Sequence, residues 1–229
     1  MRFKEFLSEG ARPADVTAQD IYNDCAYYFK SMKLTGNTLK DWMWHGTKSL
    51  PTARHPVYVV DAKTEREPRD TPIAVHNAVN QYFKQEYGQA FRNGVFATGY
   101  YSDATIYGRD HSAWALIPIG HFSWLCSAEK NGDFRDLTGM WKRTFEKVHR
   151  HLQDEHPRMN AYDVDDIAIP EAIDSLLDAI GGETWYFNEA LSTCIQSQNE
   201  IMIVCSKFYL LDRHSPLFKE LYELAGAKQ

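Results

Sequence analysis

The hydrophobic stretches of this chain are short, and this limits the folds that it can adopt. Runs of four or five apolar residues, such as 57–60 and 113–117, predict brief buried strands. Longer segments with apolar residues at helical spacing lie between these runs. This alternation predicts an α+β domain in which helices flank split, mostly antiparallel β-sheets.

Apolar periodicity and breaker residues give the expected elements. Pro72 should lie in the first turn of one helix, with Asp70 or Thr71 as its N-cap, and another helix should begin after Pro170. Helices are expected at 14–34, 72–87, 102–107, 136–153 and 171–180. Strands are expected at 41–45, 57–60, 95–98, 113–117, 184–187, 201–205 and 208–211.

Size and charge restrict the classes of protein that remain. The 229 residues, of which 44% are apolar, can bury one substantial core, so we expect a single domain over residues 10–229. The formal charge of −6 comes from 31 acidic and 25 basic residues with both signs interspersed. The chain therefore has no global electrostatic signature of binding to nucleic acid or to an anionic membrane.

The four cysteines are widely spaced and include no CxxC pair. This pattern predicts buried or free thiols in a reducing compartment rather than a disulfide framework or a zinc site, and no other metal site is expected. No segment approaches the roughly 18 consecutive apolar residues of a membrane helix. We therefore expect a cytoplasmic protein without a membrane partner.

Three short segments carry the candidate chemistry. His45 follows an expected strand in Trp44-His45-Gly46-Thr47, Tyr107 ends the segment 94–107, and Glu200 immediately precedes the apolar run 201–204. Nicotinamide is a flat cation with an amide group, so its pocket needs an aromatic face and a closely approaching backbone. Together the three segments look like the parts of a site that cleaves NAD.

The three segments resemble the His-Tyr-Glu branch of the ADP-ribosyltransferase superfamily, which contains diphtheria-type toxins and the poly(ADP-ribose) polymerases. The run 44–47 is similar to the first-strand His-Gly-Thr of that branch. The run 94–107 matches, without a gap, the family segment from a glycine to the nicotinamide-stacking tyrosine. Asn199-Glu200 before an apolar strand is similar to the position of the catalytic glutamate. The resemblance implies an ADP-ribosyltransferase-like fold with NAD as substrate.

The resemblance implies catalytic roles for Glu200, His45 and Tyr107. Breaking the nicotinamide–ribose bond creates an oxocarbenium-like centre that a carboxylate can stabilise. A carboxylate about 4 Å from a unit positive charge contributes roughly 4 kcal/mol at an effective dielectric near 20, which is about a thousandfold in rate. His45 would contact a ribose hydroxyl, and Tyr107 would stack on nicotinamide. Further contacts to NAD are expected from His45, Gly46, Thr47, Phe96, Ala97 and Tyr107.

Two departures from the family pattern bear on the reaction. Phe96 stands where the branch usually has a tyrosine, and Ala104 stands where the polymerases carry a serine. The chain is thus nearer to the toxin version, which implies transfer of a single ADP-ribose. The acceptor is expected to be a host macromolecule, a protein with nucleic acid left open, and residues 188–199 would form the loop that faces it.

The first residues resemble the leader peptides of proteins packaged into the heads of T-even-like phages. Such leaders are removed after a Leu-x-Glu sequence, here Leu7-Ser8-Glu9. The resemblance implies a cleavable leader at 1–9 and an effector, carried in a phage head, that acts in the host cytoplasm. The alternative is an ordinary amphipathic first turn.

Other interpretations remain at this stage. Taken singly, a histidine after a strand, a core tyrosine and a glutamate at a strand edge each have an ordinary structural explanation. The same fold also serves NAD glycohydrolases and RNA 2′-phosphotransferases. A third alternative is a non-catalytic phage head or interaction protein that keeps the fold without the activity.

Overall fold

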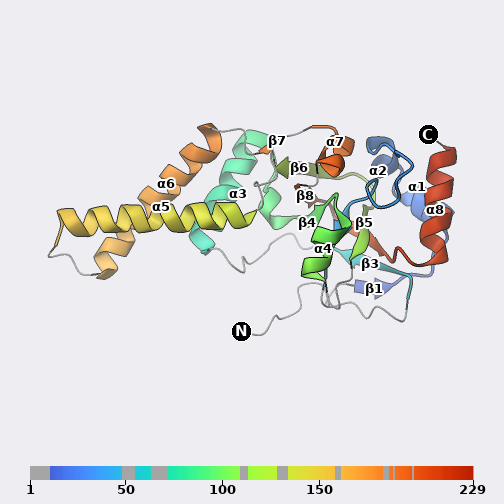
Figure 1. Ribbon diagram of the computed structural model, residues 1–229, viewed down its shortest axis with the longest axis horizontal. Coiled ribbons are helices and arrows are strands. Elements are labelled where there is room, and N and C mark those ends of the chain that lie inside the picture. Colours follow the sequence, from blue (N-terminus) through green and yellow to red (C-terminus); the bar gives the residue numbers. More distant parts are fainter. Residues whose placement is uncertain are drawn as a thin grey trace.

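A computed structural model describes residues 11–47, 55–62, 72–108, 113–127, 134–157, 161–182, 186–187, 189–197 and 199–228. Within these segments the chain combines one antiparallel sheet with helices on its faces and a helical hairpin that projects to one side (Figure 1). The expected α+β class is confirmed. The suggested leader at 1–9 lies outside the described residues.

The described strands form a single nine-stranded sheet. In chain order they are β1 (Ala11–Pro13), β2 (Trp44–His45), β3 (Val57–Asp61), β4 (Val95–Thr98), β5 (Trp114–Pro118), β6 (Ser123–Ser127), β7 (Tyr186–Phe187), β8 (Glu200–Val204) and β9 (Lys207–Leu211). Their order across the sheet is β1-β3-β9-β5-β2-β4-β8-β6-β7, and all neighbours run antiparallel.

The strand pairing is shortest between β2 and β4. These strands are paired at one position, Trp44 with Thr98, whereas β3 pairs with β9 and β4 with β8 over most of their lengths. The sheet therefore consists of a five-stranded half ending at β2 and a four-stranded half starting at β4. Instead of the separate sheets expected from the sequence, the structure has two halves joined by a single residue pair.

Helices divide the core between the two halves. Helices α1 (Ala18–Asp24), α2 (Ala26–Ser31) and α8 (Pro216–Ala227) enclose a large cluster that includes Ile21, Trp42, Trp44, Phe208 and Leu221. Helices α3 (Ile73–Tyr87), α5 (Phe134–Glu155) and α6 (Ala161–Gly182) contribute to a second cluster that includes Val79, Phe83, Leu125, Leu176 and Met202. The shorter helical elements are η1 (Phe91–Asn93), α4 (Tyr101–Tyr107) and α7 (Leu191–Gln196).

The helix expected at 14–34 is divided into α1 and α2. A capping box sets the start of α1: the Asp20 amide donates to the Thr17 hydroxyl, and the Thr17 amide donates to the Asp20 carboxylate. Buried Cys25, at φ −109° and ψ 24°, separates the two helices. Apolar spacing continues through this residue, so the sequence pattern does not reveal the break.

Pro170 lies inside α6 rather than before it, so the expected start of that helix is wrong. Proline removes a helical hydrogen bond and crowds the preceding turn. The cost is offset by packing, because Ala168, Ala172 and Leu176 on the inner face are buried. Pro170 itself is exposed, so its ring does not interrupt that packing.

Other boundaries differ less. Strand β4 has the expected bounds, β2 is shorter than expected, and the described residues of the strand expected at 184–187 form β7. Pro72 is the N-cap of α3 rather than a residue of its first turn. Residues 70 and 71, expected as its cap, lie outside the described segments. The sequence pattern did not predict β1, β6, η1, α7 or α8.

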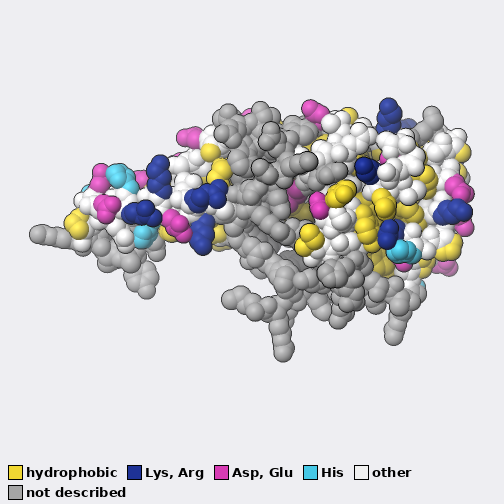
Figure 2. Space-filling model, viewed as in Figure 1, with side chains coloured by type: hydrophobic (Ala, Val, Ile, Leu, Met, Phe, Trp, Pro, Cys, Tyr) yellow, Lys and Arg dark blue, Asp and Glu magenta, His cyan; other side chains and the backbone are white. Residues whose placement is uncertain are grey.

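Helices α5 and α6 form the projecting hairpin (Figure 1). Far from the sheet, Leu152 and Ala168 form a small cluster with Phe145 and Val148. Charged side chains and histidines lie along the outside of this hairpin in the space-filling view (Figure 2). Among the helices in the described part of the chain, none combines the length and hydrophobicity that crossing a bilayer requires.

A disulfide joins Cys126 on β6 to Cys194 on α7, which corrects the expectation of unpaired thiols. The two cysteines are 68 residues apart in sequence, with Cα atoms 5.8 Å apart, so only the fold brings them together. Cys25 and Cys205 are free, and burial raises the pKa of the Cys205 thiol to about 12. Burial also raises the pKa of the Cys25 thiol, so both free cysteines are poor nucleophiles at neutral pH.

Candidate functional site

The three predicted segments converge because β2, β4 and β8 are consecutive strands of the sheet. Thr98 of β4 is the common neighbour: it pairs with Trp44 on one side and with Glu200 on the other. Two strand spacings correspond to roughly 10 Å. The Cα atoms of Trp44, which precedes His45, and Glu200 are thus roughly 10 Å apart.

His45 is oriented by the neighbouring strand. Its Nδ1 atom lies 2.7 Å from the carbonyl oxygen of Phe96. A carbonyl only accepts hydrogen bonds, so Nδ1 carries the proton in this contact, and Nε2 is the acceptor nitrogen of the neutral ring. His45 is the last residue of β2, so this contact joins its side chain to β4 next to the one residue pair of the two strands.

Glu200 is the first residue of β8 and is partly buried. Its backbone is fixed on one side by pairing with Thr98. On the other side, the preceding residue, Asn199, donates from Nδ2 to the carbonyl of Ser127 at 2.9 Å. Glu200 is therefore held at a defined end of the β4–β8 ladder.

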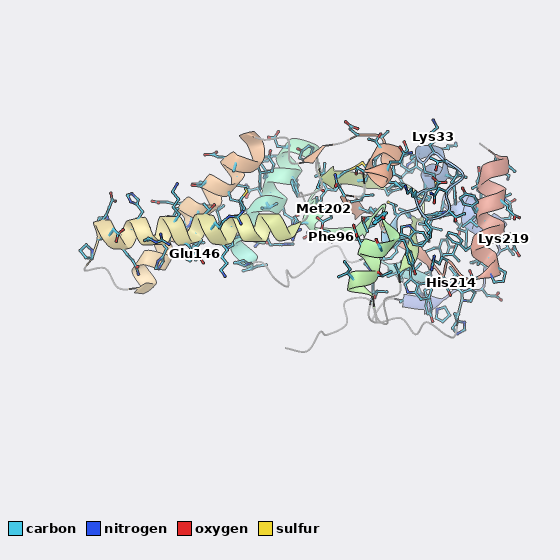
Figure 3. All side chains as sticks on the ribbon, viewed as in Figure 1. Lys33, Phe96, Glu146, Met202, His214 and Lys219 are labelled. Carbon is cyan, nitrogen blue, oxygen red and sulfur yellow. A yellow bond between two sulfur atoms is a disulfide. The ribbon has the colours of Figure 1, made fainter. Side chains whose placement is uncertain are left out.

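Phe96 faces the second core cluster. It pairs with Met202 across β4 and β8, and both side chains belong to that cluster (Figure 3). The Arg92 guanidinium lies 5.1 Å from the centre of the Phe96 ring. Strand alternation places Thr98 and Glu200 on the same face as Phe96. The ring of Phe96 is therefore on the Glu200 face of the sheet.

A buried cluster of polar side chains from α3 and η1 lies next to Phe96 and Arg92. Asn80 on α3 accepts from the Arg92 amide at 2.9 Å and donates to the Asn93 side chain at 2.8 Å. The Nε2 atom of buried His76 lies 3.1 Å from the same Asn93 oxygen. These bonds attach η1 to α3 and so fix the Arg92 position over Phe96. Only the one-turn spacing of His76 and Asn80 hinted at this cluster in the sequence.

The other predicted contact residues lie close by. Gly46 and buried Thr47 directly follow β2, and buried Ala97 pairs with Ile201 in the sheet. Tyr107 is the last residue of α4, which contacts both β2 and β4. The Tyr107 side chain lies outside the described part of the structure, so its predicted stacking on nicotinamide remains a prediction.

A cavity of about 300 Å³ lies beyond the end of β4, beside rather than over His45 and Glu200. The sequence pattern marked two of its lining residues, Ile195 and Gln196, as part of the acceptor loop, and gave no signal for the others. The cavity is lined by Thr35, Lys40, Gly99, Tyr100, Ile195 and Gln196.

One wall of this cavity is fixed by a buried carboxylate. Asp41 is 2% exposed and accepts hydrogen bonds from the Thr35 amide, the Thr35 hydroxyl, the Asn37 amide and the Tyr222 hydroxyl. Burial, followed by the hydrogen bond to Asp41, raises the pKa of Tyr222 to about 12. The loop before β2 is thus tied to α8.

Within the described segments, no group of three or more His, Cys, Asp or Glu residues is placed to hold a metal ion. The polar groups near the ends of β2 and β8 could instead hold an organic ligand with hydroxyl and amide groups. Comparison with known proteins gave no relative: no family model, curated protein or solved structure matches this chain.

Proposed function

We propose that this chain is an NAD-dependent mono-ADP-ribosyltransferase, which breaks the nicotinamide–ribose bond of NAD and transfers ADP-ribose to a macromolecule. One observation carries the proposal: the strands that bear His45, Phe96 and Glu200 are consecutive in the sheet, with Thr98 as the shared partner. Together with the resemblance of the three segments, this adjacency supports a common site.

Glu200 has the main chemical role in this proposal. Its carboxylate stabilises positive charge on the ribose as the bond from C1′ to the nicotinamide nitrogen breaks. Nicotinamide leaves as a neutral molecule with the electron pair of that bond. The nucleophilic atom of the acceptor then forms a new bond to C1′ and loses its proton.

His45 binds rather than reacts. The contact between Nδ1 and the Phe96 carbonyl fixes the tautomer and the direction of the imidazole. In this proposal the imidazole, held in that direction, contacts a ribose hydroxyl of NAD. A fixed ring contributes to the rate because the sugar is held in the orientation needed for attack.

The acceptor approaches from the side of α7 in this proposal. This helix lies shortly before Glu200 in the chain, and it forms part of the cavity beyond β4. A protein acceptor is proposed, and transfer to nucleic acid is an outcome that the test distinguishes.

The test combines NAD labelled in the adenylate group with a bacterial lysate. We expect nicotinamide release and label on protein. Glu200→Gln should lower release by about a thousandfold, following the electrostatic contribution of the carboxylate. Glu220→Gln, at an exposed position on α8, is the matched control and should release nicotinamide at the same rate as the unaltered chain.

The outcomes separate the alternatives. Release without transfer indicates a glycohydrolase, and label that is sensitive to nuclease but not to protease indicates a nucleic-acid acceptor. Absence of nicotinamide release from the unaltered chain contradicts the proposal. Equal release by the Glu200 and Glu220 variants removes the assigned role of Glu200.

A further inference from the structure

The segment that precedes Glu200 is attached to β6 at three points. The Trp124 indole donates to the Glu189 carbonyl at 2.8 Å, Cys126 forms the disulfide with Cys194, and Asn199 donates to the Ser127 carbonyl. The attachments reach the start, the middle and the end of residues 189–197 and 199, which we call the β6-bound segment. Three nearby residues of a single strand therefore hold it.

The opposite side of the β6-bound segment is also restricted. Gly99, directly after β4, lies so close to Ile195 that an added Cβ would overlap the Ile195 carbonyl group. Backbone thus packs on backbone between the end of β4 and α7. The segment cannot move toward β4 without displacing the turn into α4.

Asn199 is the attachment nearest to the proposed catalytic carboxylate. The β6–β8 register pairs Cys126 with Ile201. One step further, Ser127 stands opposite Glu200, and its carbonyl accepts from the Asn199 side chain. Asn199 is 7% exposed and Ser127 is fully buried, so bulk water does not compete for this bond.

We propose that Asn199 is a positioning residue, which fixes the start of β8 and thereby the direction of the Glu200 carboxylate. The inference rests on the proposed function and adds a residue to it. The amide is suited to this role because it matches aspartate in shape but carries the N–H donor that the carbonyl of Ser127 requires. An aspartate there would place its oxygens against that carbonyl.

The test compares Asn199→Asp and Asn199→Ala with Ser197→Ala. Ser197 lies in the same β6-bound segment. Its hydroxyl donates to the Cys194 carbonyl at 2.8 Å and accepts a longer bond, of 3.4 Å, from the Asn199 amide. The control therefore removes two hydrogen bonds within the segment and leaves the bond from the Asn199 side chain to the Ser127 carbonyl intact. Each protein is measured by hydrogen exchange over residues 199–204 and by the kinetics of nicotinamide release.

We expect the backbone amides of residues 199–204 to exchange at least about tenfold faster in both Asn199 variants, because the hydrogen bond that holds the start of β8 to β6 is lost. Their kcat should fall about 10- to 100-fold with KM for NAD within about twofold, because the ground-state contacts to NAD remain. Ser197→Ala should match the unaltered chain in both measurements.

Unchanged exchange in Asn199→Asp overturns the inference, and so does faster exchange with unchanged kcat. Equal effects in Ser197→Ala also overturn it, because any loosening of the segment would then suffice. If the unaltered chain releases no nicotinamide, the proposed function fails and Asn199 has no reaction to support. The exchange comparison still reports separately whether Asn199 anchors β8.

Discussion

Gly99 provides the sharpest test of the packing around the candidate site. In Gly99→Ala, the new Cβ would overlap the carbonyl oxygen and carbon of Ile195 and lie 2.8 Å from its Cα atom. Carbon atoms in favourable contact are separated by about 3.5–4.0 Å. Even the most distant of the three atoms must therefore move by about 0.7 Å or more. All three atoms belong to the backbone, so no side-chain rotation can relieve the overlap.

The loss of stability in Gly99→Ala should be near the upper limit found for overpacked sites. Insertion of a methyl group into a packed interior costs about 1–3 kcal/mol, and more where the surroundings cannot move. Here the neighbouring residue, Cys194, is held by the disulfide, and Asn199 is held by Ser127. We expect Gly99→Ala to lose about 3 kcal/mol, which lowers Tm by about 6–12 °C for a chain of this size.

Urea unfolding and calorimetry measure this change, with Gly226→Ala as the matched control. A Cβ on Gly226, in α8, would lie 3.8 Å from Leu34 Cδ1, which is an ordinary contact. Alanine is also the better helix former by up to about 1 kcal/mol. The control should be neutral or slightly stabilising. If Gly99→Ala changes stability by less than about 0.5 kcal/mol, the close approach of α7 to the end of β4 is wrong.

Three further predictions concern stability. Asp41→Ala should lower the free energy of unfolding by about 3 kcal/mol, because a buried carboxylate that accepts four hydrogen bonds is lost. Asp61→Ala, which removes exposed ion pairs, should cost less than about 1 kcal/mol in the same urea titration. A dithiol reductant should lower the free energy of unfolding by about 4 kcal/mol, since the disulfide closes a loop of 68 residues. A Cys126→Ser/Cys194→Ser variant whose unfolding free energy still falls with the reductant would contradict this prediction. Because the pKa of Tyr222 is raised, the stabilisation of the fold by its protonated hydroxyl is complete below pH 10 and is lost as pH rises toward 12. Tyr222→Phe should therefore lose less stability than the unaltered chain over that interval. Parallel plots of unfolding free energy against pH for the two proteins would refute the assignment.

Local sequence patterns predicted the elements that carry the candidate site. Strand β4 has the expected bounds, and β8 differs by one residue at each end, because short apolar runs with clear flanking signals are typical of buried strands. Apolar periodicity did not predict helix boundaries that depend on tertiary packing. It does not show the break at Cys25, and it favoured a helix start after Pro170 although the inner face of α6 packs through that residue.

The supporting contacts of the site could not be predicted in the same way. The bond between His45 and the Phe96 carbonyl depends on where β2 ends relative to β4, and the bond between Asn199 and Ser127 depends on the β6–β8 register. Strand β6 itself was not recognised. The disulfide likewise depends on the approach of α7 to β6, which spacing along the chain does not encode.

The single-pair connection between β2 and β4 has a mechanical consequence. His45 belongs to one half of the sheet and Glu200 to the other, with Trp44 and Thr98 as the only strand pairing between the halves within the described residues. A rotation of the halves about this point would disturb the few backbone bonds at that pair, whereas the longer ladders within each half would stay intact. The hydrogen bond from the His45 imidazole to the Phe96 carbonyl crosses the same junction, so a rotation would have to break this bond before the imidazole could move away from the Glu200 carboxylate.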